Sequence, residues 1–138
     1  MSNDHRIETF TYKKVSAPAV VFFHPGGLSV GSKESWVPKW LLEPMIAEGY
    51  MFIMPEYQLM PPANGHEILH DIQDLFIFLP TLELPVGKEY VQVDSQRIAF
   101  AGSSAGGLCS YLATSDKVPV SPKAILSLYG MGGDFFVS

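Results

Sequence analysis

Short apolar segments alternate with amphipathic segments of helical length along this 138-residue chain. The clearest apolar run is Ala17–His24 (APAVVFFH), two others are Tyr50–Met54 and Arg97–Ala101, and Lys123–Tyr129 (KAILSLY) is a further predicted strand. Continuous apolar runs of this length are typical of strands that are buried on both faces of a sheet. Because helices are expected between them, the pattern predicts an α/β fold with a mostly parallel sheet flanked by helices.

The amphipathic segments predict three helices, over Pro38–Glu48, Asn64–Leu79 and Ala105–Ser115. In the second helix, Asn64 can cap the first turn and Glu67 can reach back to complete a capping box. The first helix is expected to pack one apolar side, made up of Trp40, Leu41, Met45 and Ile46. Outside the helices, we expect an edge strand over Ile7–Lys14 and flexible loops over Pro61–Gly65 and Leu82–Val93.

The composition favours a single globular domain over residues 1–138. A hydrophobic content of 47% argues against disorder, and a net charge of −5 argues against nucleic acid or an anionic membrane as a partner. No apolar run reaches the roughly 18 residues of a membrane span, and the first residues lack the apolar core of a signal peptide. The single cysteine, Cys109, excludes an internal disulfide, so we expect a cytoplasmic protein.

The segment Gly102–Gly106 (GSSAG) directly follows one of these strands and leads into a predicted helix. This is the G-x-S-x-G pattern, in which a sharp strand-to-helix turn exposes a serine hydroxyl for attack on an acyl carbon. Gly102 and Gly106 suit such a turn because a Cβ at either position would collide with neighbouring backbone. The pattern therefore predicts that Ser104 is a nucleophile, with the free N–H groups of the helix start close to it.

A second glycine-containing turn, His24–Gly27 (HPGG), ends the first apolar run. Glycines let backbone N–H groups turn toward a developing negative charge. The functional groups of parallel sheets gather at the carboxyl ends of the strands, so this turn should lie beside Ser104. We therefore predict that the N–H groups of Gly26, Gly27 and Ala105 form an oxyanion hole.

Taken in order, four segments resemble the hormone-sensitive-lipase-like group of α/β-hydrolases, the fold-3 carboxylesterases. His24–Gly27 matches the H-G-G-G loop of that family, and Tyr57–Pro62 (YQLMPP) matches its Y-R-L-A-P-E segment. Val93–Ile98 (VDSQRI) matches V-D-P-S-R-I, and Gly102–Gly107 (GSSAGG) matches G-D/E-S-A-G-G. The resemblance extends over Val20–Gly130, nearly all of the chain.

This resemblance implies hydrolysis of carboxylic esters through an acyl-enzyme on Ser104, with the oxyanion held by the three N–H groups named above. It implies a small-molecule ester as the substrate, with no cofactor and no metal ion. Two residues depart from the family pattern. Pro25 stands in place of the first glycine of the loop, and Ser103 stands in place of the acidic residue before the nucleophile.

In the family, the catalytic acid and histidine follow the strand that matches Lys123–Tyr129, in considerably longer proteins. In this chain no histidine follows Ser104, and the acids that follow it are Asp116 and Asp134. The four histidines all precede it, and the position of His24 resembles that of a loop-bracing residue. We therefore expect the N-terminal part of an incomplete α/β-hydrolase fold, in which the triad acid and base are not present. Because a serine without a base is a weak nucleophile, we expect impaired activity.

Two alternatives stay open. The chain could be an inactive hydrolase fragment, from a truncated gene or a degenerate paralogue, or a binding module whose open sheet edge favours self-association. It could also be a zinc hydrolase, because His66–His70 (HEILH) matches the H-E-x-x-H pattern with Glu67 as the base. On a helix, however, His66, His70 and Asp74 fall on the face opposite the apolar side, which favours a solvated surface.

The remaining candidate side chains are assigned to packing. Cys109 lies on the helix after Ser104 and is expected to be a buried small hydrophobe. Trp36 and Trp40 could line a pocket, but we expect them to pack against the rest of the protein.

Overall fold

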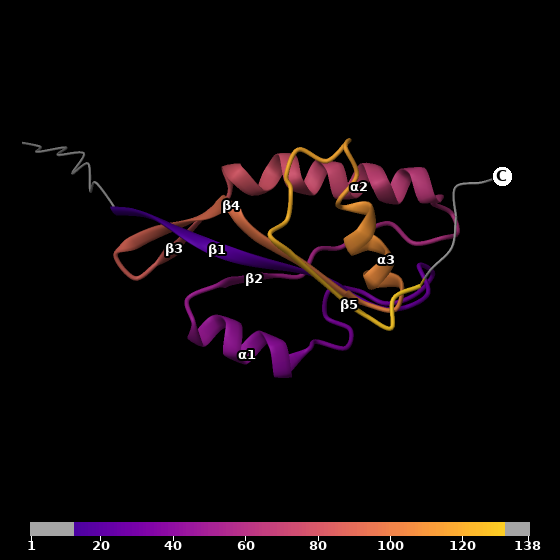
Figure 1. The fold of residues 1–138 in the computed structure, drawn as a ribbon, viewed down its shortest axis with the longest axis horizontal. Helices are drawn as coiled ribbons and strands as arrows, with labels where there is room; N and C mark the ends of the chain where they lie inside the picture. Colours follow the sequence, from indigo (N-terminus) through magenta and orange to yellow (C-terminus); the bar gives the residue numbers. More distant parts are fainter. Residues whose placement is uncertain (1–12, 132–138) are drawn as a thin grey trace, which may run out of the picture.

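The computed structural model describes residues 13–131 and shows one β-sheet with helices on both faces (Figure 1). Its elements, in chain order, are β1 (Lys13–Phe23), α1 (Lys39–Ala47), β2 (Met51–Ile53), α2 (Gly65–Phe78), the 3-10 turn η1 (Leu79–Thr81), β3 (Glu83–Val86), β4 (Glu89–Ser103), α3 (Ala105–Leu112) and β5 (Ala124–Leu128). Helices α2 and α3 cover one face of the sheet, and α1 lies on the other. None of the helices within residues 13–131 has the length and hydropathy of a membrane-spanning segment.

The described strands form a five-stranded sheet in the order β2-β1-β4-β3, and β5 also pairs with β4. Strand β3 pairs with the first residues of β4 and β5 with its last residues. The pairs β1–β2, β1–β4 and β4–β5 are parallel, and β3–β4 is antiparallel. The mostly parallel α/β sheet predicted from the sequence is therefore confirmed. Phe23 pairs with Gly102, so β1 and β4 end side by side.

Alternate side chains of β1 enter two hydrophobic clusters on opposite faces of the sheet. Val21 and Phe23 join the cluster beneath α2 and α3, whereas Val20 faces α1. In the larger cluster, the rings of Phe76 from α2 and Phe100 from β4 lie 4.6 Å apart between centroids. Burial of both faces explains why β1 and the second half of β4 read as continuous apolar runs.

Helix α2 begins with the capping box that the sequence predicts. The Asn64 Oδ1 accepts the backbone N–H of Glu67 at 3.1 Å, and the Glu67 carboxylate accepts the backbone N–H of Asn64 at 2.8 Å. The helix buries Ile68, Ile72 and Phe76 against the sheet. These positions are spaced by four residues, so one side of the helix is fixed to the core.

A hairpin replaces the flexible loop that the sequence predicts over Leu82–Val93. Glu83–Val86 pairs antiparallel with the start of β4, and the strand predicted over Arg97–Ala101 begins at Glu89 instead. All four β3 side chains are exposed, so β3 buries little apolar surface. Besides the backbone pairing, the Glu83 carboxylate accepts a hydrogen bond from the Gln92 Nε2 at 2.9 Å and lies 2.9 Å from the Lys14 ammonium. In Figure 1 the hairpin projects away from the helices, alongside the first half of β1.

Strand β4 makes a detour between its two halves. Its register against β1 shifts between Ala17 and Ala19, where the partner residue advances from Val93 to Ile98. Within the detour, the Arg97 Nε donates to the Asp94 carboxylate at 2.8 Å, and this hydrogen bond lowers the pKa of Asp94. The V-D-S-Q-R-I segment is therefore a stabilised irregularity in a long strand.

Two further predictions need correction, and a third falls largely outside the described residues. Strand β2 comprises three half-buried residues, where the sequence predicted a buried strand over Tyr50–Met54. Helix α1 packs Leu41 and Met45 toward the sheet, but Ile46 and Trp40 are 55% and 59% exposed. The hydrophobic cluster between α1 and the sheet is small, so only a few side chains of this short helix are needed to cover it. The edge strand predicted over Ile7–Lys14 lies outside the described residues before position 13, where β1 begins.

Candidate active site

Ser104 occupies a strained turn between β4 and α3. Its backbone angles are φ 51° and ψ −118°, in a region that non-glycine residues rarely adopt. Its N–H donates to the Leu128 carbonyl at 2.9 Å, and its carbonyl accepts the N–H groups of Gly107 at 3.0 Å and Met131 at 2.9 Å. With the Leu108 N–H, which also donates to the Ser104 carbonyl at 3.4 Å, four hydrogen bonds hold this conformation, and strain that is held in this way is typical of functional sites.

The glycines on either side of Ser104 are required by close packing of backbone. A Cβ at Gly102 would collide with the carbonyl group of Gly106, and a Cβ at Gly106 would collide with the carbonyl group of Phe23. The sequence-based prediction of such collisions is confirmed. The contact between Gly106 and Phe23 brings the start of α3 against the end of β1.

The Gly26–Gly27 turn lies beside Ser104 at this end of the sheet. The two glycines have φ values of 131° and 63°, which explains why glycine suits both positions. Together with Ser104 they line a cavity of about 620 Å³. Among residues 13–131, no carbonyl accepts the backbone N–H of Gly26, Gly27 or Ala105. These three donors are the ones expected from the sequence, although Ala105 itself is buried and its side chain does not line the cavity.

His24 supports the Gly26–Gly27 turn from the interior of the protein. Its fully buried ring stacks on Tyr57 with centroids 4.2 Å apart, and the Tyr57 hydroxyl donates to the His24 carbonyl at 2.7 Å. The His24 Nδ1 lies 2.7 Å from the Pro25 carbonyl, so Nδ1 must carry the proton of that hydrogen bond. The Nε2 of the ring is buried and finds no partner among the described residues.

The Tyr57–Pro62 segment acts as a brace, a role that the sequence analysis did not find. Besides the Tyr57 hydrogen bond, the Met60 N–H donates to the carbonyl of Leu28, directly after the glycine turn, at 2.7 Å. Burial raises the pKa of Tyr57 well above its ordinary value, so its hydroxyl stays protonated and remains a donor. The sequence signal was the tyrosine itself, because a buried phenol hydroxyl needs a partner.

The cavity beside Ser104 contains no histidine and no acid among its described lining residues. His66, His70 and Asp74 lie on the exposed side of α2, as the helical geometry predicts, and Asp116 is exposed after α3. Within residues 13–131, no three His, Cys, Asp or Glu side chains are close enough to hold a metal ion. His5 and Asp134 lie outside the described residues.

The two tryptophans do not pack in the core as expected. Trp36 is 64% exposed and Trp40 is 59% exposed, and both line the cavity that contains Ser104. The expectation of packing is therefore wrong. Both residues flank Pro38 at the start of α1, a short helix without any fully buried residue, so this segment offers no interior to receive the rings.

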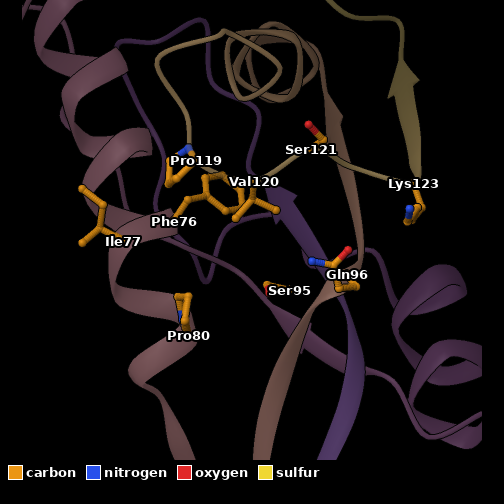
Figure 2. A pocket seen from close by; sticks show the side chains of 9 residues that line it. All are labelled: Phe76, Ile77, Pro80, Ser95, Gln96, Pro119, Val120, Ser121 and Lys123. Carbon is orange, nitrogen blue, oxygen red and sulfur yellow. The ribbon is translucent and has the colours of Figure 1, made fainter.

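A second cavity, of about 520 Å³, lies at the other end of β5 (Figure 2). Phe76, Ile77 and Pro80 line it from the end of α2 and η1, and Ser95 with Lys123 lines it from the sheet side. The lining contains no acid, histidine or cysteine among the described residues, and Lys123 precedes β5, whereas Ser104 follows β4. The described lining of this cavity therefore places no histidine or carboxylate beside Ser95 or Ser121 that could activate a hydroxyl group.

Comparison with known proteins assigns the chain to a family. Residues 7–122 match the family model BD-FAE. The chain belongs to the BD-FAE family. The probable carboxylesterase M8 of Phoma sp. (strain ATCC 20986 / MF5453) is 32% identical to this BD-FAE member over 119 residues, which are 82% of this chain and 37% of that protein. The chain thus spans little more than a third of the length of the curated relative that it matches.

Solved esterase structures share the fold. A bacterial heroin esterase matches 86% of this chain and 36% of its own, with a TM-score of 0.66 at 23% identity. An esterase of Rhizomucor miehei matches 89% of this chain and 38% of its own, with a TM-score of 0.66 at 24% identity. The BD-FAE chain therefore adopts part of the α/β-hydrolase fold, and the resemblance to hormone-sensitive-lipase-like esterases is confirmed.

Cys109 provides a test of how tightly α3 packs. Its side chain is fully buried, as the sequence predicts, and burial raises the pKa of its thiol to about 12. Because only the thiolate reacts with alkylating reagents, we expect almost no modification of the native chain by iodoacetamide near neutral pH. In urea, modification should become rapid over the same range as the loss of helical circular dichroism. Fast modification in buffer alone would show that α3 opens without global unfolding.

Proposed function

We propose that this chain supplies the nucleophile and the oxyanion hole of a carboxylic ester hydrolase. Ser104 would attack the ester, and the backbone N–H groups of Gly26, Gly27 and Ala105 would stabilise the oxyanion. The observation that carries the proposal is the strained turn at Ser104, which opens into the same cavity as the Gly26–Gly27 turn. The carboxylesterase relative supports the reaction class.

The proposed reaction has two steps. The Ser104 Oγ bonds to the carbonyl carbon and loses its proton, and the tetrahedral adduct then expels the alcohol, which takes up a proton. Water hydrolyses the resulting acyl-enzyme. Each oxyanion donor contributes about 10²- to 10³-fold to such a step.

A base for the first step is missing from the described lining of the cavity. Loss of the base costs about 10⁶-fold in kcat in a serine hydrolase, while the oxyanion hole retains part of the rate enhancement. We therefore propose that the chain alone forms an acyl-enzyme slowly. In the longer proteins that share this fold, the histidine and the acid that activate the serine would lie in the part of the chain that follows the region matched here. The absence of a base also favours one second candidate, a binding module that holds esters without cleaving them.

The test is acylation of the 138-residue chain by p-nitrophenyl acetate, followed by intact-protein mass spectrometry and peptide mapping. We expect a single acetyl group on Ser104, absent from Ser104→Ala and retained in Ser29→Ala, in which an exposed serine next to the glycine turn is removed. Added imidazole should accelerate acylation of the native chain, because it can replace the missing base. Equal acetylation of Ser104→Ala, or no effect of imidazole on the Ser104 adduct, would contradict the proposal.

A further inference from the structure

Exposed aromatic side chains gather at the cavity beside Ser104. Tyr129, Trp36 and Trp40 are 80%, 64% and 59% exposed, more than any other aromatic side chain within residues 13–131. All three line this cavity. Exposed aromatic rings that converge on one hollow are typical of ligand sites, because each ring offers a large apolar surface at a small entropic cost.

Backbone strain gathers at the same place. Within residues 13–131, the non-glycine residues with positive φ are Leu28, Trp36, Ser104 and Tyr129. Three of them line the cavity, and Leu28 directly follows the Gly26–Gly27 turn. Strain of about 1 kcal/mol or more at each position persists only where the surroundings enforce it. The positive φ of Trp36 therefore coincides with its place in the cavity lining, as it does for Ser104.

The lining and size of the cavity define what fits it. Apart from the backbone and serine groups near Ser104, the described lining consists of apolar or aromatic side chains, with no Lys, Arg, Asp or Glu. Its volume of about 620 Å³ lies within the usual range for small-molecule sites. A charged group would lose its hydration there without gaining an ionic partner.

We propose that Trp36 and Trp40 are specificity-determining residues that bind an uncharged, ring-sized apolar group of the ester whose carbonyl lies at Ser104. This inference rests on the proposed function and adds the chemistry of the group beside the reacting carbonyl. The ring can belong to the acyl part or to the alcohol part of the ester, and the test has an arm for each. Binding of a second copy of this chain over the tryptophans is an outcome that the test also detects.

The chain has its own reporter for this site. It contains two tryptophans, and both line the cavity, so their fluorescence reports ligand binding without any requirement for turnover. In Ser104→Ala, we expect saturable changes in tryptophan emission with methyl benzoate or with phenyl acetate. Monomethyl terephthalate, which adds a carboxylate to the same ring, should bind at least about tenfold more weakly, equivalent to 1.4 kcal/mol.

Two alanine variants on α1 distinguish loss of a cavity-lining side chain from loss of an exposed side chain elsewhere on the same helix. Trp40→Ala should weaken ring binding about tenfold, with Trp36 as the remaining reporter. Ile46→Ala should leave binding unchanged, because Ile46 lies on the same helix and is 55% exposed but does not line the cavity. Circular dichroism checks that both variants fold.

Four results would overturn the inference. They are an emission change that does not saturate, equal binding of the charged analogue, unchanged affinity in Trp40→Ala, and ligand-free emission that changes on dilution, which would show that a second copy covers the rings. Ring binding without acylation of Ser104 would instead contradict the proposed function, so the two failures are distinguishable.

Discussion

Gly106→Ala is expected to destabilise the chain by about 3 kcal/mol or more, the upper range for forcing extra volume into packed backbone. The new Cβ would collide with the carbonyl group of Phe23 and approach the carbonyl oxygen of His24 at 2.8 Å. These are backbone atoms of the last residue of β1 and of the residue after it, so no flexible side chain can move aside. Relief requires α3 to move away from β1, which separates Ser104 from the Gly26–Gly27 turn.

The matched control is Gly87→Ala in the turn of the hairpin. A Cβ at Gly87 meets nothing within 4 Å, but the φ of 61° is unfavourable for alanine and should cost about 1 kcal/mol. Urea unfolding followed by far-ultraviolet circular dichroism measures both variants, since the exposed tryptophans report poorly on the core. If the two variants lose equal stability, the collision at Gly106 is relieved at no cost and the close contact is not required.

The interior of the fold could be predicted because each buried strand carries its own pattern. The alternation of Val20 and Val21 toward two clusters needs apolar residues at every position, and such a run has few interpretations. The Asn64–Glu67 capping box and the glycines around Ser104 could also be predicted, since local geometry alone imposes them.

The β3–β4 hairpin could not be predicted in the same way. Pro85 and Gly87 resemble loop residues, and the β3 side chains are all exposed, so burial leaves no periodic signal. The contacts of the hairpin with β1 are also distant in the sequence: Lys13 lies opposite Glu89, and the Lys14 ammonium lies 2.9 Å from the Glu83 carboxylate. The tryptophans were missed for the opposite reason. Their apolarity indicated packing, but a ring that lines an open cavity has the same sequence signature as one in a core.

The brace behind the glycine turn makes a second prediction with a large effect. His24→Ala removes a fully buried ring that stacks on Tyr57, and the resulting cavity should cost about 3 kcal/mol. His24→Phe keeps a ring against Tyr57 and removes the unpartnered Nε2, but it places a carbon near the Pro25 carbonyl in place of Nδ1. A cost of about 1 kcal/mol is therefore expected for the phenylalanine variant.

The same pair of variants separates bracing from proton transfer. If His24 only holds the turn in place, His24→Phe should acylate Ser104 at nearly the native rate. If His24 were the general base, its loss would slow acylation about 10²-fold or more in both variants. Its side chain does not line the cavity, and its Nδ1 proton is committed to Pro25, so we expect the first result. Measuring acetylation of Ser104 together with urea unfolding of both variants decides between the two roles, because only bracing links the loss of rate to the loss of stability.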